Sequence, residues 1–404
     1  MIFMSFIAFR LAKGMTIIMK IVFLSNYFNH HQKPLSDELF SLLNGNYYFI
    51  ETMPIEEERV KLGWGNDKKP DYLLQSYKSE HDLRVCKNLV DSADAVIIGS
   101  ASESFIKNRL INGKLIFRYH ERPLKKGIEL YKYPIRYLKW HKNNPKTANI
   151  YMLCASAFTA GDYAKFGLFK NKCLKWGYFT EAKRYADINH LIETKKKNSI
   201  IWVARFIALK HPEVVSAIGE RLLKDGYDFE INMIGNGELL ESTRSVLEEK
   251  GLTSYVNILG SMIPEDVRKY MENSEIHIFT SDKNEGWGAV LNESMNSACV
   301  PISSHAIGST PYLIDNGVNG LVYEDGNEED LYSKIKFLID NRDKMKEMSE
   351  NAYKTIIDMW SPKNAAKRLI KITELIINDK EIGLFKDGPC SKADIIIDDW
   401  FVDE

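Results

Sequence analysis

Two glutamates and two glycines stand close together in the second half of the sequence, in the segment Glu285-Gly-Trp-Gly-Ala-Val-Leu-Asn-Glu293. Gly286 and Gly288 allow a sharp turn and a close approach of the backbone to a ligand. The segment opens a predicted helix, whose free N–H groups and positive dipole end suit an anion such as phosphate. Glu293 lies about 200° around that helix from the apolar Leu291, so its carboxylate is expected to face a ligand. These features predict a site for an anion joined to a group with several hydroxyls. The alternative is a glycine-rich turn that caps a core helix and carries two exposed glutamates.

Two cations are expected beside this segment. The predicted strand Ile200–Val203 runs into Arg205, and Lys210 follows five residues later, before a helix that starts near Pro212. At the carboxyl end of this strand, a guanidinium and an ammonium would face the same cleft as Glu285 and together could neutralise a diphosphate. The alternative is a pair of surface cations in a polar loop.

Another glycine-rich turn, Ile234-Gly-Asn-Gly-Glu238, also joins a predicted strand to a predicted helix. It lacks the third glycine of the G-x-G-x-x-G fingerprint, as do the other turns of this kind in the sequence. Because a dinucleotide pyrophosphate docks on that fingerprint, the sequence disfavours a dinucleotide-dependent dehydrogenase.

Histidines are the candidate chemical groups of the first half. His30 and His31 follow the first predicted strand, and His120 ends the run Phe117-Arg-Tyr-His that follows another. His120 suits a hydrogen bond or a proton transfer near neutral pH, with a structural histidine as the alternative. His30 and His31 could reach the cleft, or they could be solvated loop histidines.

The elements that would position these groups alternate between strands and helices, which predicts parallel β-α-β units in two doubly wound α/β domains. Their ligand is expected between the domains, at the carboxyl ends of the strands. The first predicted series has strands at 21–24, 47–50, 95–98, 115–117 and 150–153, with helices at 34–43 and 81–90. The second has strands at 200–203, 229–234, 256–259, 275–280, 300–303 and 320–323, with helices at 211–224 and 239–250.

The domain boundaries follow from the composition along the chain. Residues 1–18 are either an over-extended start or an N-terminal arm, residues 19–180 form the first domain, and the polar stretch 181–199 is a linker. Residues 200–360 form the second domain, and 361–404 form a helix and tail that cross back to the first domain. The acidic, aromatic end of this tail suits a docking strand or a dimer contact.

Composition excludes several classes of protein. The chain has 404 residues, 45% of them hydrophobic, which fits two soluble globular domains and excludes a disordered or fibrous chain. Its net charge of −1 disfavours a nucleic-acid binder. The five cysteines show no C-x-x-C spacing, so neither a zinc site nor a disulfide framework is indicated, and a reduced cytoplasmic location fits. The apolar stretch Met1–Phe9 is too short to span a bilayer.

The neutral total hides an asymmetry of charge. Residues 1–180 carry 27 basic and 16 acidic side chains, which leaves 27 basic and 39 acidic side chains in 181–404, so the two parts carry +11 and −12. The segment 122–146 supplies +7 of this, with eight basic residues against Glu129. Tyr131, Tyr133, Tyr137 and Trp140 lie among these cations, a mixture that suits an anionic membrane surface. By composition it would also suit nucleic acid, or be an ordinary solvated basic face.

In their order and spacing, these motifs resemble the donor-binding half of a retaining, GT-B type glycosyltransferase of family 4, among the glycosyl transferases group 1. The resemblance covers the C-terminal domain and is more diffuse in the N-terminal domain. One departure concerns the first loop, where many relatives carry a glycine pair and this chain has Asn29, His30 and His31. The motifs that carry the resemblance are Arg205-x4-Lys210, the turn at 234–237, Leu259-Gly-Ser-Met-Ile-Pro, the E-x7-E segment 285–293, Pro301, Gly308 and Asn319-Gly-Leu-Val.

The resemblance implies two Rossmann-like domains that face each other across a cleft, and a nucleotide diphosphate sugar as donor. Arg205 and Lys210 would hold the diphosphate and stabilise the leaving group, as a metal ion does in other transferases. Glu285 would bind sugar hydroxyls, Glu293 the ribose diol, Met262 would lie near the base, and His120 beside the donor sugar. The expected catalytic residues are thus His120, Arg205, Lys210 and Glu285. The expected donor-binding residues are Gly235, Met262, Gly286, Trp287, Gly288, Ala289, Val290 and Glu293. His30 and His31 are expected on the acceptor side.

The sequence therefore predicts a retaining, metal-independent glycosyltransferase without a cofactor. It would move a sugar to a glycan or lipid-linked acceptor in surface polysaccharide synthesis, at the cytoplasmic face of the cell membrane, which segment 122–146 would contact. Two alternatives remain open: a sugar-nucleotide epimerase or phosphorylase on the same architecture, which would turn over donor without a separate acceptor, and a non-catalytic sugar-nucleotide-binding protein. A nucleic-acid partner is not expected, since the acidic second half would repel phosphate backbones.

Overall fold

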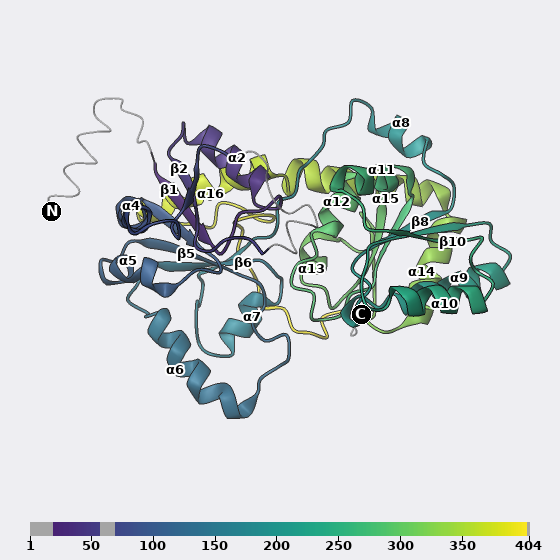
Figure 1. Ribbon diagram of the computed structural model, residues 1–404, viewed down its shortest axis with the longest axis horizontal. Helices are drawn as coiled ribbons and strands as arrows, with labels where there is room; N and C mark the ends of the chain where they lie inside the picture. Colours follow the sequence, from purple (N-terminus) through teal and green to yellow (C-terminus); the bar gives the residue numbers. More distant parts are fainter. Residues whose placement is uncertain (1–18, 57–68, 402–404) are drawn as a thin grey trace.

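The computed structural model describes residues 19–56 and 69–401. The sequence predictions for residues 1–18 lie outside the described residues. The described chain forms two α/β domains side by side, each built on a parallel sheet (Figure 1). This confirms the predicted fold class.

The N-terminal domain is built on a seven-stranded sheet with the strand order β3-β2-β1-β4-β5-β6-β7. Every neighbouring pair within it is parallel. Its strands are β1 (Ile21–Ser25), β2 (Tyr47–Glu51), β3 (Leu73–Gln75), β4 (Ala95–Ile98), β5 (Leu115–His120), β6 (Ile150–Cys154) and β7 (Cys173–Lys175). Its helices are α2 (Lys33–Leu42), α4 (Glu80–Ser92), η1 (Glu103–Phe105), α5 (Lys107–Ile111), η2 (Leu130–Lys132), α6 (Tyr133–Asn143) and α7 (Thr159–Ala164).

The C-terminal domain repeats this plan with a six-stranded parallel sheet in the order β10-β9-β8-β11-β12-β13. Its strands are β8 (Ser199–Val203), β9 (Glu230–Ile234), β10 (Val256–Gly260), β11 (Ile276–Phe279), β12 (Val300–Ser304) and β13 (Leu321–Tyr323). The helices from the linker onward are α8 (Ile188–Glu193), η3 (Ala208–Lys210), α9 (Glu213–Lys224), α10 (Leu240–Glu249), α11 (Pro264–Asn273), α12 (Val290–Asn296), α13 (Thr310–Leu313), α14 (Glu328–Asp340), α15 (Arg342–Lys354), η4 (Thr355–Met359) and α16 (Pro362–Ile377).

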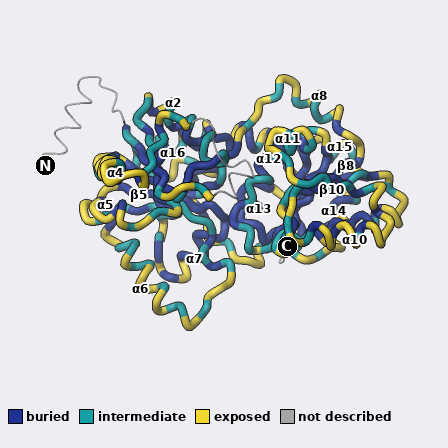
Figure 2. The backbone as a smooth tube through the Cα atoms, in the orientation of Figure 1, coloured by how far each residue is buried: buried dark blue, intermediate teal, exposed yellow. Residues whose placement is uncertain are grey.

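The central strands are apolar on both faces because helices cover both sides of each sheet. Strands β1, β4 and β11 are buried along their whole length, and Figure 2 shows buried backbone at the centre of each domain with exposed backbone at its periphery. In each sheet the strand order reverses between the first and fourth strands, and the loops beyond their carboxyl ends form a crevice there. The two crevices face each other.

One apolar cluster joins the domains. Trp176 and Phe179, which follow β7, pack with Trp287 and Trp360 of the second half of the chain. Gly177 is required at this contact, because a Cβ there would lie 2.3 Å from the Trp287 ring. Beyond it, α16 extends from the C-terminal domain across to α2 of the N-terminal domain (Figure 1).

The predicted linker, residues 181–199, is not exposed throughout, although its composition is polar. It contains α8, and the Lys195 side chain is buried. Its ammonium lies 2.8–3.1 Å from four backbone carbonyls, of Met271, Glu272, Ser274 and Ser297, which share its three N–H donors. Burial lowers the pKa of Lys195, and the four carbonyls replace the water that a surface lysine would bind.

The tail beyond α16 returns to both domains. Residues 390–393 lie against β7, where Lys175 N–H donates to the Ser391 carbonyl at 2.7 Å and Cys390 N–H to the Lys175 carbonyl at 2.8 Å. Further on, the Trp400 indole donates to the carbonyl of His305 in the C-terminal domain at 3.1 Å. The tail thus connects the edge of one sheet with the other domain.

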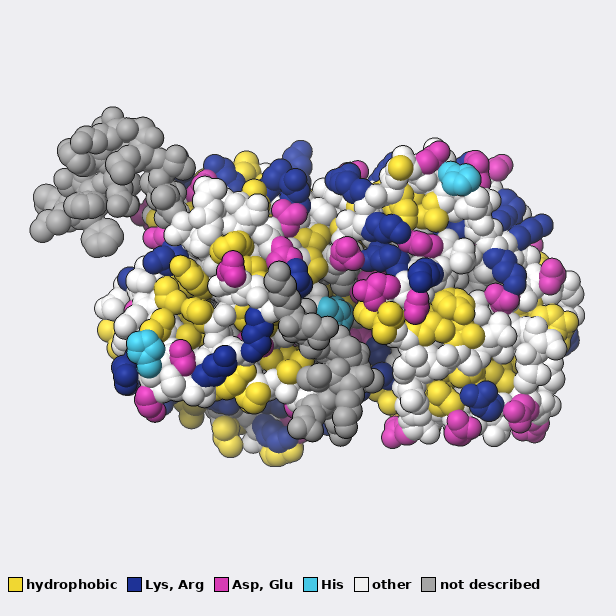
Figure 3. All heavy atoms as spheres, turned by 45° about the horizontal axis from the view of Figure 1, so that its top comes forward, with side chains coloured by type: hydrophobic (Ala, Val, Ile, Leu, Met, Phe, Trp, Pro, Cys, Tyr) yellow, Lys and Arg dark blue, Asp and Glu magenta, His cyan; other side chains and the backbone are white. Residues whose placement is uncertain are grey.

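Neither sign of charge is gathered into one patch on the C-terminal domain in the view of Figure 3, where basic and acidic side chains are interspersed. Within residues 19–56 and 69–401, no helix combines the length and the apolar character needed to cross a bilayer.

Candidate active site

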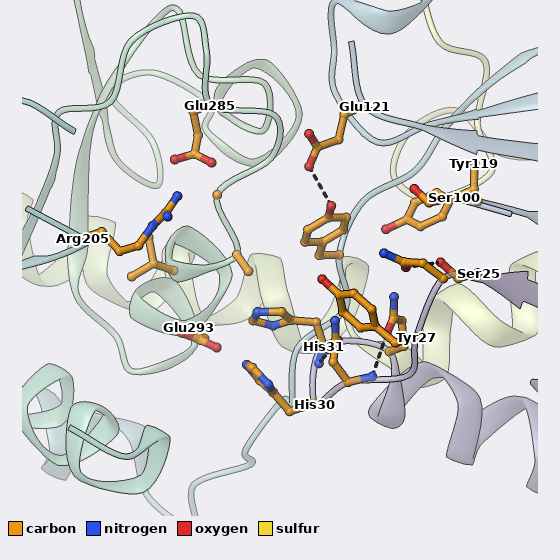
Figure 4. A pocket seen from close by; sticks show the side chains of 18 of the residues that line it. Ser25, Tyr27, His30, His31, Ser100, Tyr119, Glu121, Arg205, Glu285 and Glu293 are labelled. Atoms are coloured by element: carbon orange, nitrogen blue, oxygen red, sulfur yellow. Dashed lines mark hydrogen bonds between the residues drawn. The ribbon is translucent and has the colours of Figure 1, made fainter. Parts of the chain in front are cut away.

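A cavity of about 800 Å³ lies between the two domains, at the carboxyl ends of both sheets (Figure 4). The N-terminal domain contributes the loops after β1, β4 and β5 and the segment after β7. The C-terminal domain contributes the ends of β8 and β10 and the loop between β11 and α12. Of the residues predicted from sequence, those that line the cavity are His30, His31, His120, Arg205, Lys210, Met262, Glu285, Gly288, Ala289, Val290 and Glu293.

Arg205 and Lys210 both reach the cavity from the loop after β8. Of the two, only Lys210 forms an ion pair within the described residues. Arg205 is exposed to the cavity, and its guanidinium forms no ion pair or hydrogen bond within the described residues. Lys210 instead forms an ion pair with Glu285, whose carboxylate also accepts a hydrogen bond from the Ser281 hydroxyl at 3.2 Å. The Lys210 carbonyl accepts from Thr280, which fixes this loop to the end of β11. Lys210 and Glu285 therefore act as one unit.

The loop 285–289 approaches its neighbours closely. Gly288 has φ of 81°, in the left-handed region, and a Cβ there would meet the Phe279 ring at 2.3 Å. A Cβ on Gly286 would lie 1.8 Å from Oε2 of Glu121 in the N-terminal domain. Helix α12, which follows, is short, with seven residues.

Gly286, Trp287 and Gly235 were predicted to bind the donor, but none of the three lines the cavity. The Trp287 indole is fully buried in the cluster that joins the domains and donates to Asn292 at 2.8 Å, so it does not line the cavity. Gly235 also lies outside the lining; a Cβ on it would come 1.8 Å from the Ala204 carbonyl, so it allows two loops to pack. The sequence motif could not separate a ligand contact from a packing contact, because both favour glycine and aromatic residues.

Glu293 projects into the cavity from α12, opposite the core face of the helix, as the helical spacing predicts (Figure 4). Its carboxylate accepts no hydrogen bond from any residue in 19–56 or 69–401. Burial raises the pKa of Glu293 to about 7, and the guanidinium of Arg268 partly opposes this rise. The carboxyl group is thus a hydrogen-bonding group whose charge changes near neutral pH.

His30 and His31 lie in the turn between β1 and α2. The Asn29 side chain accepts from the His31 N–H at 3.0 Å, and Glu51 accepts from the Phe28 N–H at 2.7 Å, so the turn is held from both sides. Burial is the main cause that lowers the pKa of His30, and that of His31 to about 3. Both rings are therefore neutral at physiological pH.

His120 ends β5 on the same side of the cavity. Its Nδ1 lies 3.3 Å from the Tyr163 hydroxyl. Burial, and then the nearby charge of Arg118, lower the pKa of His120 to about 4. A neutral His120 can donate or accept a hydrogen bond, but it is poorly suited to donate a proton as an imidazolium.

Three further residues of the N-terminal wall were not predicted from the sequence. Tyr119, Glu121 and Tyr178 line the cavity, and the Tyr178 hydroxyl donates to Glu121 Oε1 at 2.6 Å (Figure 4). Tyr119 and Glu121 flank His120 at the end of β5. Their position beside a predicted site residue is the sequence feature that could have identified them. Tyr178 follows β7, a strand of three residues whose pattern is too short to recognise.

Comparisons with known proteins agree with this geometry. Residues 184–355 match the family model of glycosyl transferases group 1. An uncharacterized glycosyltransferase of Methanocaldococcus jannaschii is 31% identical over 125 residues, 31% of this chain and 34% of that protein. The alpha-D-kanosaminyltransferase of Streptomyces kanamyceticus is 24% identical over 43% of this chain and 44% of its own. The matches thus span less than half the length of these curated relatives.

Among solved structures, HepE of Anabaena in complex with UDP superposes with a TM-score of 0.66 at 12% identity, over 88% of this chain and all of that one. A likeness at this identity concerns the fold. The chain therefore has the GT-B fold, and its C-terminal domain carries the sequence signature of glycosyl transferases group 1.

Proposed function

We propose that this protein is a retaining glycosyltransferase that moves a sugar from a nucleotide diphosphate sugar to a glycan or lipid-linked acceptor in surface polysaccharide synthesis. The observation that carries the proposal is the single cavity in which Arg205, the Lys210–Glu285 pair and Glu293 face His120 of the other domain. The family match of the C-terminal domain and the complex of HepE with UDP support a nucleotide-bound donor on the same wall.

The proposed roles follow from charge and position. Arg205 and Lys210 hold the diphosphate and stabilise the negative charge that grows on it as the sugar departs. Glu285 remains hydrogen-bonded to Lys210 and accepts hydrogen bonds from sugar hydroxyls, while Glu293 accepts those of the ribose diol. The backbone of 288–290, which lines the cavity, lies along the phosphates and sugar, and Met262 lies near the base. His120, being neutral, offers a hydrogen bond to the sugar.

Retention of configuration requires that the acceptor oxygen attack from the face that the phosphate leaves. The bond between the anomeric carbon and the phosphate oxygen breaks, the acceptor oxygen bonds to that carbon, and its proton passes to the departing phosphate. We propose that this step needs neither a metal ion nor a cofactor, since Arg205 and Lys210 supply positive charge at the diphosphate.

A screen of nucleoside diphosphates and nucleotide sugars tests the donor site. In the presence of EDTA, one nucleoside diphosphate and its sugar are expected to raise Tm by several degrees, because a ligand at about 100 times its Kd adds about 2.7 kcal/mol to the stability. With a glycan acceptor, NMR of the product is expected to show the anomeric configuration of the donor.

Other outcomes would favour other functions. Donor turnover without an added acceptor would indicate an epimerase or, with phosphate, a phosphorylase. Stabilisation by nucleotide sugars without turnover under any acceptor would indicate a binding protein. An inverted product would contradict the retaining mechanism, and loss of stabilisation in EDTA would contradict metal independence.

We also propose that α6 places the enzyme on an anionic membrane at the cytoplasmic face. Tyr133 and Trp140 pack inward against Phe166, whereas Leu130, Ile135 and Leu138 are 82%, 69% and 70% exposed. The exposed cations Lys126, Lys139 and Lys142 flank them, a pattern typical of a helix at a membrane interface. Fewer of the eight basic residues in 122–146 are available to a membrane than the sequence indicates. Arg122 is buried, and Lys125, Lys132 and Arg136 form ion pairs.

Substitution of Leu138 by Glu is expected to lower flotation with vesicles rich in anionic lipid by about tenfold, because it places a charge on the apolar face of α6. Ile111→Glu provides the matched control, since Ile111 is 74% exposed on α5 of the same domain. Equal flotation of both variants and the wild type, or binding of the wild type that does not weaken with salt, would contradict the membrane contact.

A further inference from the structure

The two walls of the cavity differ in their free positive charge. On the C-terminal wall, Arg205 has no ion-pair partner within the described residues. On the N-terminal wall, the lining cation Arg122 is neutralised by Asp398 at 2.7 Å and by Asp162 at 3.4 Å. The described lining of the N-terminal wall therefore contains no unpaired Lys or Arg.

The histidines of this wall add no positive charge near neutral pH. Burial is the largest cause that lowers the pKa of His30, of His31 to about 3 and of His120 to about 4. An anionic group held by the described residues of this wall would thus lose its hydration without gaining an unpaired cation.

Glu121 is paired with Lys125, so the two side chains together add no net charge to this wall, but the carboxylate keeps free hydrogen-bonding capacity. Its Oε1 accepts from the Tyr178 hydroxyl at 2.6 Å and its Oε2 from the Lys125 ammonium at 2.9 Å. A carboxylate offers about four lone-pair positions, so about two remain for a ligand. The side chain is 31% exposed, to the cavity that it lines.

The groups around Glu121 suit a sugar. Hydroxyls of Ser25 and Ser100 and the rings of Tyr119 and Tyr178 share the cavity with it (Figure 4). Tyrosine rings offer an apolar face to C–H groups, and hydroxyls match hydroxyls. Across the cavity, Glu121 lies against Gly286, where a Cβ would come 1.8 Å from Oε2. A hydroxyl bound to Glu121 would therefore lie next to the loop that is proposed to hold the donor sugar.

We propose that the N-terminal wall binds the end of the acceptor that reacts, that this end is an uncharged sugar, and that the Glu121 carboxylate accepts a hydrogen bond from one of its hydroxyls. This inference rests on the proposed function and narrows its acceptor class: phosphorylated sugars and uronic acids are excluded from this position. Any phosphate of a carrier lipid must then lie outside this wall.

Saturation-transfer NMR with matched neutral and charged sugars tests the inference. The neutral probes are the methyl α-glycosides of glucose, galactose and mannose, and the charged probes are the 6-phosphates of these sugars and the methyl glycosides of glucuronate and galacturonate. Each is measured with the protein alone and with the protein saturated by the nucleoside diphosphate that stabilises it best. At least one neutral glycoside is expected to bind about tenfold or more tightly than its charged counterparts, because the described lining of the wall offers a hydrogen-bonding carboxylate and no unpaired cation.

Glu121→Gln is expected to weaken binding of that glycoside about tenfold, because a neutral amide is a weaker acceptor than a carboxylate. Tyr178→Phe, which frees the carboxylate from its hydrogen bond, is expected to have a smaller effect of the same sign. Glu80→Gln is the matched control, since Glu80 is exposed at the start of α4 and does not line the cavity. Affinity for the nucleoside diphosphate should change less than about twofold in each variant, since Glu121 lies on the opposite wall.

Three results would overturn the inference: charged probes that bind as tightly as neutral ones, Glu121→Gln that binds like the wild type, or no binding of any neutral glycoside in either state of the protein. Failure of the proposed function gives a different result. In that case no nucleoside diphosphate stabilises the protein, whatever the sugars do.

Discussion

Replacement of Lys210 by alanine is expected to lower kcat/KM for the donor by about a thousandfold or more, since loss of one charged group at a transferring phosphate costs about this much in other enzymes. Lys210 is fixed by the contact of its carbonyl with Thr280 and by its ion pair with Glu285. Its ammonium is therefore already positioned when a diphosphate arrives, and alanine removes this charge. Steady-state assays with nucleotide sugar measure the change.

The fold is expected to persist in this variant, with a free energy of unfolding lowered by about 1–3 kcal/mol because Glu285 loses its partner in a partly buried position. Circular dichroism and denaturant unfolding measure this loss. Lys283→Ala is the matched control: it removes an exposed lysine from the loop between β11 and α12, which carries the partner Glu285, and this lysine lies outside the lining of the cavity. The control should leave kcat/KM unchanged within about twofold. Activity of Lys210→Ala near that of the wild type would refute the phosphate-binding role.

The charge of Glu293 is expected to give stability and donor binding opposite dependences on pH. Burial raises the pKa of Glu293 from 4.5 to about 7. A raised carboxyl pKa favours the protonated form in the folded state, so its contribution to stability is complete below about pH 4.5 and is lost as the pH rises to about 7. At 1.36 kcal/mol per pH unit, this loss is at most about 3 kcal/mol. The ionised carboxylate is the stronger hydrogen-bond acceptor, so affinity for the nucleotide should rise over the same range.

Glu293→Gln should remove both dependences. At pH 8 the variant is expected to be more stable than the wild type and to bind nucleoside diphosphate at least about tenfold more weakly, because it keeps the shape of the side chain and loses its charge. Unfolding curves and calorimetric titrations at pH 5.5 and 8 measure these quantities. Glu249→Gln, at an exposed position on α10, is the control and should follow the wild type. If both glutamine variants show the same pH profile, the ribose-binding assignment fails.

Sequence periodicity located the central strands well, because a strand buried on both faces must be apolar throughout. The predicted strand 95–98 coincides with β4, and 21–24 lies within β1. It missed β3 and β7, which have three residues each and lie at the edges of their sheet. Edge strands of this length carry too few residues to show a pattern, and partners distant in the sequence determine their place.

The site was easier to predict where function depends on charge at the end of a strand. Arg205, Lys210, Glu285 and Glu293 meet in one cavity because parallel strands bring their carboxyl ends together. Trp287 illustrates the limit: its position in a motif cannot show that its ring packs on Gly177, which lies 110 residues earlier in the numbering. Pairing of Arg122 with Asp398 was equally hidden, since no local pattern links residues 276 positions apart.

The return of the last described helix and tail to the first domain affects how the protein is made. Helix α16 covers α2, and residues 390–393 pair with β7 at the edge of the N-terminal sheet. During synthesis the ribosome produces the N-terminal sheet first, but this sheet receives its cover and its last edge partner from residues translated some 200 positions later. A nascent N-terminal domain therefore exposes the apolar surface beneath α16 for as long as the C-terminal domain is being translated.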